Sequence, residues 1–100
     1  MLIIAGHIHV DPADGAQFLA DLKELAMAAR KRPGNSAYDI AMEDPQAGLL
    51  LISERWTDQA ALSAHLDAAE TVAFVNRWQV RMQGDVRKFD ASNERGLMDS

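Results

Sequence analysis

The chain has 100 residues, 48% of them hydrophobic and 25% charged, which is typical of one globular domain with a buried core. Its formal net charge of −5 argues against a nucleic-acid partner, because phosphates attract basic surfaces. The absence of cysteine excludes a disulfide framework, thiolate catalysis and cysteine-type zinc sites. No apolar run is long enough to span a bilayer and no signal peptide is evident, so we expect a cytoplasmic protein with no membrane partner.

The first third of the chain predicts a strand followed by a helix. Residues 2–10 are rich in β-branched residues, contain no proline and carry apolar side chains on both faces. Asp11 is a suitable helix N-cap and Pro12 suits the first helical position. We expect a helix from there to about Lys31, ended by the proline–glycine pair that follows. Its apolar stripe is Phe18, Leu22, Leu25 and Ala29, and its water-facing side holds Asp21, Lys23 and Glu24.

The next two elements predict an antiparallel hairpin. Residues 35–43 alternate polar and apolar side chains, as a strand with one buried face does. Residues 44–48 (Asp-Pro-Gln-Ala-Gly) have turn chemistry, so residues 49–56 should return antiparallel to the preceding strand. This third strand begins with four consecutive apolar residues and ends in Glu-Arg-Trp. Its first half is therefore expected to be apolar on both faces.

The remaining part predicts a helical region and a final strand. Asp58 can cap a short helix that continues through Leu66, and a second helical piece is expected over about residues 70–82. Residues 84–90 alternate as the last strand. The resulting order, β-α-β-β-α-β, is that of the ferredoxin-like α+β fold, with both helical regions on one face of the sheet.

We expect one domain over residues 1–91 and a loose polar tail over residues 92–100. Because residues 2–10 and 49–52 are apolar on both faces, the side of the sheet without helices would expose a large apolar patch. Covering several hundred Å² of it is worth on the order of 10 kcal/mol before association costs. The chain has no spare element to do so, which predicts a homodimer paired through the sheet face.

Four short motifs follow one another in the second half of the chain: Glu54-Arg55-Trp56, Ala60-Ala61-Leu62, His65-Leu66 and Gly84-Asp85-Val86. Together with residues 5–12 and Pro33-Gly34, their order and spacing resemble the antibiotic biosynthesis monooxygenase family over about residues 2–90. The resemblance implies a dimeric α+β barrel. The family includes cofactor-free oxygenases of phenols and quinols, haem-degrading enzymes and small isomerases, so membership alone does not fix the reaction.

The family's functional residues are only partly present. Trp56 matches the tryptophan that quinone-forming members keep in their pocket. Ile52 and Leu62 stand where those members have asparagine and tyrosine. Val75 stands at about the place of the proximal histidine of the haem-degrading members. The resemblance therefore does not imply haem degradation, and we expect no cofactor.

Oxygenation without a metal or flavin needs a substrate that becomes an electron-rich anion, a base with a pKa near the working pH, a dry pocket and donors for the oxyanion. Histidine, with an ordinary pKa of about 6.5, is a natural base. The candidate catalytic residues are His65, which should face the sheet, and His7 on the first strand. The candidate substrate-binding residues are Trp56, Tyr38, Phe74, Trp78, Leu62 and Ile52.

Each candidate also has a purely structural interpretation. His65 could be a buried helix residue bonded to a carbonyl, and His7 a hydrogen-bonded interface residue. The aromatic side chains could simply pack against the sheet. His7 and His9 lack a third ligand in the sequence, so no metal site is predicted.

Three functions remain open from the sequence. We expect a small homodimeric, cofactor-independent monooxygenase that binds a phenol- or quinol-like aromatic molecule in an apolar pocket between helices and sheet. One alternative is a cofactor-free isomerase of a small carbonyl compound, for which a single histidine suffices. Another is a non-catalytic dimer that binds a small ligand, favoured by the missing asparagine and tyrosine.

Overall fold

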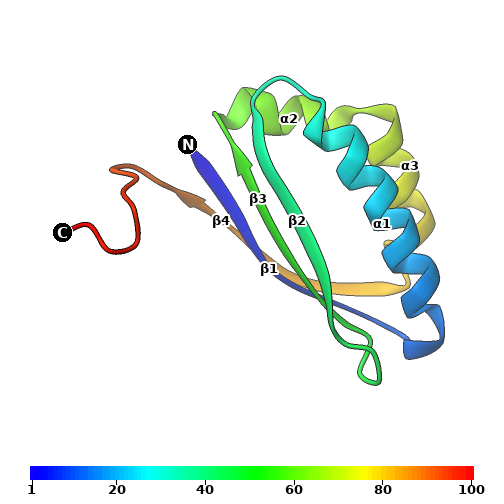
Figure 1. Cartoon of the computed structure of the whole chain (residues 1–100). Helices are drawn as coiled ribbons and strands as arrows, with labels where there is room; N and C mark the ends of the chain where they lie inside the picture. The colour runs from blue at the N-terminus through cyan, green and yellow to red at the C-terminus, as the bar shows by residue number, and fades with distance from the viewer.

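A computed structural model describes residues 1–100. One antiparallel sheet has the strand order β2-β3-β1-β4 and consists of β1 (Leu2–Val10), β2 (Asn35–Asp44), β3 (Leu49–Trp56) and β4 (Met82–Asp90). The helices α1 (Gly15–Arg30), α2 (Gln59–Asp67) and α3 (Ala69–Trp78) all lie on one face of it (Figure 1). This confirms the predicted ferredoxin-like α+β fold. None of the helices is long and apolar enough to cross a membrane.

The second helical region consists of two helices, as predicted. They are separated at Ala68, whose extended backbone (φ −67°, ψ 146°) interrupts the helical path. α3 ends at Trp78, and β4 begins at Met82, which pairs with Val10 of β1. The expected helix over residues 70–82 was therefore wrong at its C-terminal end, where strand pairing takes over from the helical pattern.

The start of the first helix also differs. The Asp11 carboxylate accepts a hydrogen bond from the backbone N–H of Ala13 at 2.9 Å, as a cap should. The turn that it caps is, however, a separate 3₁₀ helix, η1 (Pro12–Asp14), and α1 begins only at Gly15. The predicted apolar stripe of α1 is buried against the sheet.

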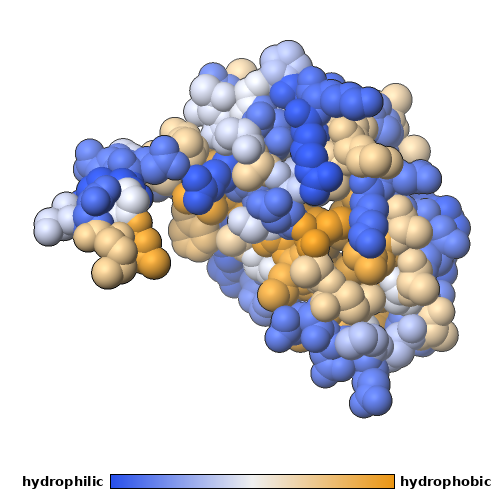
Figure 2. Space-filling model, in the orientation of Figure 1, coloured by the Kyte–Doolittle hydropathy of each residue, from blue (hydrophilic) through white to orange (hydrophobic).

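The hydrophobic core lies between the sheet and the helices. Burial along β3 alternates strictly, so that Ile52, Glu54 and Trp56 face the helices while Leu51 and Arg55 face away. The largest fully buried side chains are Trp56, Trp78, Phe18, Leu22 and Leu50. Figure 2 shows apolar side chains gathered between the two layers and polar ones over the outer surfaces of the helices.

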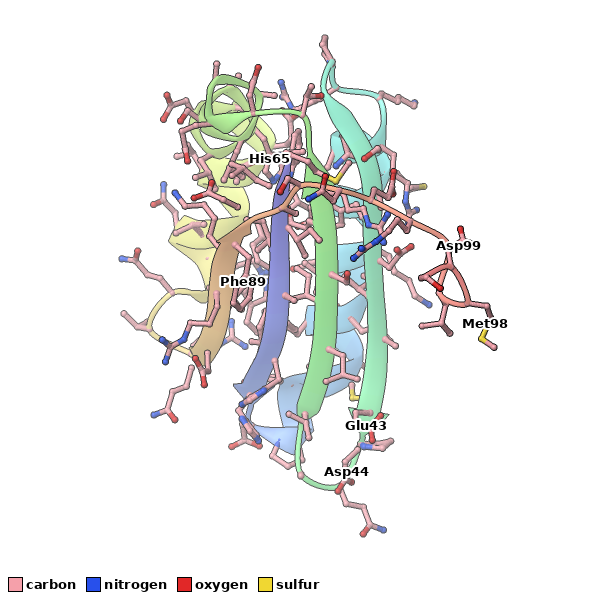
Figure 3. The ribbon with its side chains drawn as sticks, turned by 90° about the vertical axis from the view of Figure 1, so that its left-hand side faces the viewer. Glu43, Asp44, His65, Phe89, Met98 and Asp99 are labelled. Carbon is pink, nitrogen blue, oxygen red and sulfur yellow. The ribbon has the colours of Figure 1, made fainter.

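The other side of the sheet, which we call the helix-free face, is partly apolar. Strand register assigns to it Ile3, Ala5, His7 and His9 of β1, Leu51, Ser53 and Arg55 of β3, Ala37, Asp39 and Ala41 of β2, and Asp85, Arg87 and Phe89 of β4. Figure 3 looks onto this face and labels Phe89. Leu51 and Phe89 are 42% and 54% exposed. The two histidines make the second half of β1 less apolar on this side than predicted.

Beyond Asp90 the chain has neither helix nor strand. An ion pair of 3.0 Å between Arg55 and Glu94 ties the beginning of this tail to β3. Farther along, Leu97 and Met98 are almost fully exposed. Figures 1 and 3 show the tail leaving β4 and passing in front of the helix-free face.

Candidate functional site

A cavity of about 420 Å³ lies between the sheet and the helices. Its walls are mostly apolar and come from all three helices and from strands β1 to β4. Leu66, Val75 and Val86 line it while remaining 36–52% exposed, so they mark its rim. The cavity therefore opens between α2, α3 and the edge strand β4.

Two buried titratable side chains of the sheet line this cavity. Glu54 of β3 and Tyr38 of β2 are directly paired across neighbouring strands and therefore point to the same side. Both are buried, with exposed fractions of 6% and 3%. A carboxyl buried this deeply needs a partner, and Glu54 has one in the indole Nε1–H of Trp56, which donates a hydrogen bond of 2.9 Å.

A third titratable group, the imidazole of His65, comes from α2. The Asp58 carboxylate caps this helix by accepting a hydrogen bond of 2.9 Å from the backbone N–H of Ala61. The three-residue spacing of Leu62 and His65 then turns both side chains toward the sheet. In Figure 3 His65 lies behind the sheet, at one end of the strands.

Aromatic contacts hold the imidazole in place. The His65 ring stacks on the Trp56 ring, with centroids 4.8 Å apart and an interplanar angle of 26°. The Tyr38 ring meets it edge-on at 5.7 Å. Thr71 Oγ1 lies 3.4 Å from His65 Nδ1. Trp56 thus contacts both the buried carboxyl and the imidazole, and its side chain joins them into one cluster.

Burial shifts the pKa values of all three side chains, Glu54, His65 and Tyr38. It raises the pKa of Glu54 above 4.5, although the hydrogen bond from Trp56 partly opposes the shift. It lowers the pKa of His65 below 6.5, helped by the positive charge of Arg32 and opposed by Glu70. It raises the pKa of Tyr38, with the nearby Glu54 charge acting in the same direction. At neutral pH the imidazole is therefore uncharged and able to accept a proton, while the phenol keeps its proton and can donate a hydrogen bond.

Five of the eight residues singled out from the sequence line the cavity: His65, Tyr38, Ile52, Leu62 and Phe74. Trp56 is fully buried and sits behind the His65 ring.

Trp78 is also fully buried and packs edge-on against Phe18 at 5.0 Å. Its Nε1–H donates a hydrogen bond of 2.9 Å to the carboxylate of Asp21. That carboxylate also pairs with Arg77 at 2.9 Å. The prediction that Asp21 simply faces water was therefore wrong, because it is the polar partner of a buried indole.

The structure does not bring the two predicted catalytic histidines together. His7 belongs to the helix-free face, where it is paired with Leu51 of β3 and Asp85 of β4, and it does not line the cavity. The rings of His7 and His9 meet edge-to-face at 5.8 Å. No group of three or more His, Asp or Glu side chains is arranged as metal ligands.

Sequence reasoning did not select Glu54 as a site residue. The sequence did contain a signal for it. Ile52, Glu54 and Trp56 are every second residue of one strand, so their side chains must lie on the same face of the sheet. A carboxyl between an isoleucine and a tryptophan on the buried face of a strand is unusual enough to suggest function.

Comparison with known proteins agrees with this architecture. The family model described as antibiotic biosynthesis monooxygenase matches residues 1–77. The curated protein named "Putative monooxygenase YcnE" of Bacillus subtilis is 28% identical over 75 residues, which are 75% of this chain and 79% of that protein.

Solved structures are similar over nearly the whole chain. One titled a "putative antibiotic biosynthesis monooxygenase" from Deinococcus radiodurans has a TM-score of 0.87 and 21% identity, covering 99% of this chain and all of the other. Protein PA3566 from Pseudomonas aeruginosa has a TM-score of 0.81 and 20% identity, covering 92% and 94% of the two chains. With the family model covering more than three quarters of the sequence, the chain belongs to the antibiotic biosynthesis monooxygenase family.

Proposed function

We propose that this protein is a cofactor-independent monooxygenase acting on a phenol- or quinol-like aromatic molecule held in the cavity between sheet and helices. The observation that carries the proposal is the cluster of Glu54, Tyr38 and His65 at the wall of a mostly apolar cavity. A flat aromatic ring suits the apolar walls. The polar cluster supplies the proton acceptors and the donor that the chemistry requires.

In the proposed reaction, neutral His65 removes the proton of the substrate hydroxyl, and Tyr38 donates a hydrogen bond to the resulting oxyanion. The electron-rich anion passes an electron to O₂, and the two radicals combine into a peroxide on a ring carbon. Protonated His65 returns its proton to the outer peroxide oxygen. Glu54 then removes the ring proton while the O–O bond breaks, and the departing hydroxide takes that proton as water. One oxygen atom stays on the ring as a quinone carbonyl and the other leaves in water.

Oxygen uptake with a panel of simple phenols and quinols tests this function. We expect uptake accompanied by quinone absorbance, and His65→Ala is expected to reduce the rate about 10²–10⁴-fold, as loss of a general base does. The exposed Lys31→Ala, at the end of α1, serves as a control that should leave the rate unchanged. Turnover of every tested substrate without O₂ consumption would contradict the proposal.

The rate should also depend on pH in a defined direction. Because burial lowers the pKa of His65 below 6.5, the neutral imidazole persists into mildly acidic solution. We expect kcat/KM to fall on the acid side with an apparent pKa below 6.5. A pH profile measured at constant ionic strength checks this. An acid limb centred above 6.5 would show that another group controls the step.

A cofactor-free isomerase of a small carbonyl compound is the second candidate. It is favoured by the presence of two proton acceptors, Glu54 and His65, in one cavity, since an isomerase must remove a proton at one carbon and return it at another. Conversion under strictly anaerobic conditions, lost in His65→Ala, distinguishes it from the oxygenase. Tight binding without any conversion would instead identify a ligand-binding protein.

We also propose that two copies pair through their helix-free faces. Leu51 and Phe89 are large, apolar and exposed there, and Leu51 lies at the centre, between His7 of β1 and Ala41 of β2. Such a patch is commonly covered by a partner, and two-fold pairing is the commonest arrangement.

Leu51→Glu tests the pairing, because it would bury a charge in the apolar centre of the proposed interface. We expect the dimer dissociation constant to rise at least about 100-fold, measured by analytical ultracentrifugation. Val80→Glu is the matched control, since Val80 is 86% exposed in the turn before β4. A native protein that sediments as a folded monomer at micromolar concentration would refute the dimer.

A further inference from the structure

One row of side chains crosses the sheet beneath the cavity. In the strand register, Lys88 of β4 is paired with Ile4 of β1, Ile4 with Glu54 of β3, and Glu54 with Tyr38 of β2. Directly paired residues point to the same side of a sheet, and all four line the cavity. The row thus runs from a cation at the mouth, over an apolar side chain, to the buried carboxyl and phenol.

Lys88 has no carboxylate partner. Its Nζ donates a hydrogen bond of 2.7 Å to Oε1 of Gln59 on α2, and the amide group of Gln59 is itself held by a bond of 3.0 Å to Ser63. The protein's five ion pairs all involve arginine, including Arg87, which pairs with Asp85. Lys88 is therefore a cation at the cavity mouth whose recorded partner is neutral, in a chain with a net charge of −5.

We propose that Lys88 is a specificity-determining residue that binds a carboxylate of the substrate, at the end of the cavity opposite the reacting hydroxyl. The proposal rests on the proposed function and narrows its substrate class to phenols or quinols that carry a carboxylate. A carboxylate would replace the Gln59 oxygen as the acceptor for Nζ, and a bond between two charged groups is stronger than one to a neutral amide.

The dimensions of the row fit such a molecule. Neighbouring strands lie about 4.8 Å apart, so the backbones at Lys88 and Glu54, two strands apart, are separated by about 10 Å. The lysine side chain reaches into part of that distance. A single benzene ring resting on Ile4, with its carboxylate and hydroxyl at opposite ends, spans the rest. A ligand of this shape would present its hydroxyl to Glu54, Tyr38 and His65.

Binding of two probes of the same shape tests the inference. 4-Hydroxybenzoate and 4-hydroxybenzamide differ in charge but hardly in size, and their dissociation constants can be measured by calorimetry at about pH 7 and low ionic strength. We expect the carboxylate to bind at least about tenfold more tightly than the amide. Added salt should weaken this preference, because Lys88 is exposed.

Variants then assign the preference to one residue. Lys88→Gln is expected to abolish it, and Lys88→Arg to retain most of it. Lys23→Gln is the matched control: it removes the same charge from the exposed side of α1, does not touch the cavity, and should leave the preference intact.

The outcomes separate this inference from the proposed function. Equal affinity for the two probes, absence of binding by both, or an unchanged preference in Lys88→Gln would overturn the role of Lys88. None of these results depends on turnover. Oxygen uptake and its loss in His65→Ala would still decide the proposed function independently.

Discussion

Replacing Glu54 by glutamine is expected to stabilise the fold at neutral pH while reducing turnover by at least about 100-fold. Glutamine keeps an oxygen that can accept the hydrogen bond from Trp56 Nε1, so the packing of the buried indole is preserved. It removes the carboxyl whose burial raises the pKa of Glu54 above 4.5. The variant therefore separates the cost of a buried charge from the packing that surrounds it.

The sign of the effect follows from proton linkage. A carboxyl with a raised pKa in the folded state stabilises the fold only while it is protonated, and this contribution is lost as the pH rises from 4.5 through the folded pKa. The glutamine side chain of Glu54→Gln does not ionise, so this variant lacks that pH dependence. We expect the variant to gain about 1–2 kcal/mol in free energy of unfolding over the native protein at about pH 8, and the gain to shrink toward pH 4.

Urea unfolding at several pH values measures this difference. Glu43→Gln is the matched control, since it removes an exposed carboxylate from β2 without touching the cavity. It should change the free energy of unfolding by no more than about 0.5 kcal/mol. A stability difference for Glu54→Gln that is independent of pH would contradict the buried-charge interpretation. Unchanged oxygen uptake in this variant would remove Glu54 from the reaction.

Gly6→Ala is expected to destabilise the protein by about 2–4 kcal/mol. Gly6 lies in the middle of β1, where β4 approaches it closely: a Cβ added at this glycine would come within 2.1 Å of the backbone oxygen of Asp85. Relief of the clash requires the backbone of β4 to move, and β4 carries the rim of the cavity. The change should therefore weaken ligand binding as well as lower the melting temperature.

Gly84→Ala provides a control in the same pair of strands. A Cβ at Gly84 would meet only the side chain of Val86, at 3.8 Å. This variant should be neutral or gain about 0.4–1 kcal/mol, because alanine reduces the entropy of the unfolded chain. Thermal unfolding of the two variants side by side makes the comparison. Equal melting temperatures for Gly6→Ala and the native protein would mean that the two strands separate without cost.

Local patterns were enough to predict the elements and their order. A proline-free run rich in β-branched residues located β1, the Asp-Pro-Gln-Ala-Gly turn located the β2–β3 hairpin, and the cap at Asp58 located the start of α2. Each of these signals is contained within a few consecutive residues. The sequence pattern was less informative where strand pairing competes with helix propensity. For this reason the last helix was predicted to extend to about residue 82, although it ends at Trp78.

The candidate site was only partly predictable for the same reason. The spacing of Leu62 and His65 on one helix sufficed to turn the imidazole inward. The sequence alone did not reveal that Trp56 would bridge this ring and the Glu54 carboxyl, because the bridge joins a helix to a strand. Asp21 was likewise predicted to face water. Its carboxylate instead accepts a hydrogen bond from the buried indole of Trp78, which is 57 residues away in sequence.

The sequence by itself determined the order of the strands and helices, the apolar stripe of the first helix, and which family the motifs resemble. Periodicity and helix capping depend on residues that are close together in the sequence, so they can be recognised without knowing the tertiary structure. Only the tertiary structure decided that His7 and His65 lie on opposite sides of the sheet and that Glu54, Tyr38 and Lys88 share one cavity. Those relations depend on the register between strands, and register is fixed by the packing of the whole sheet against its helices.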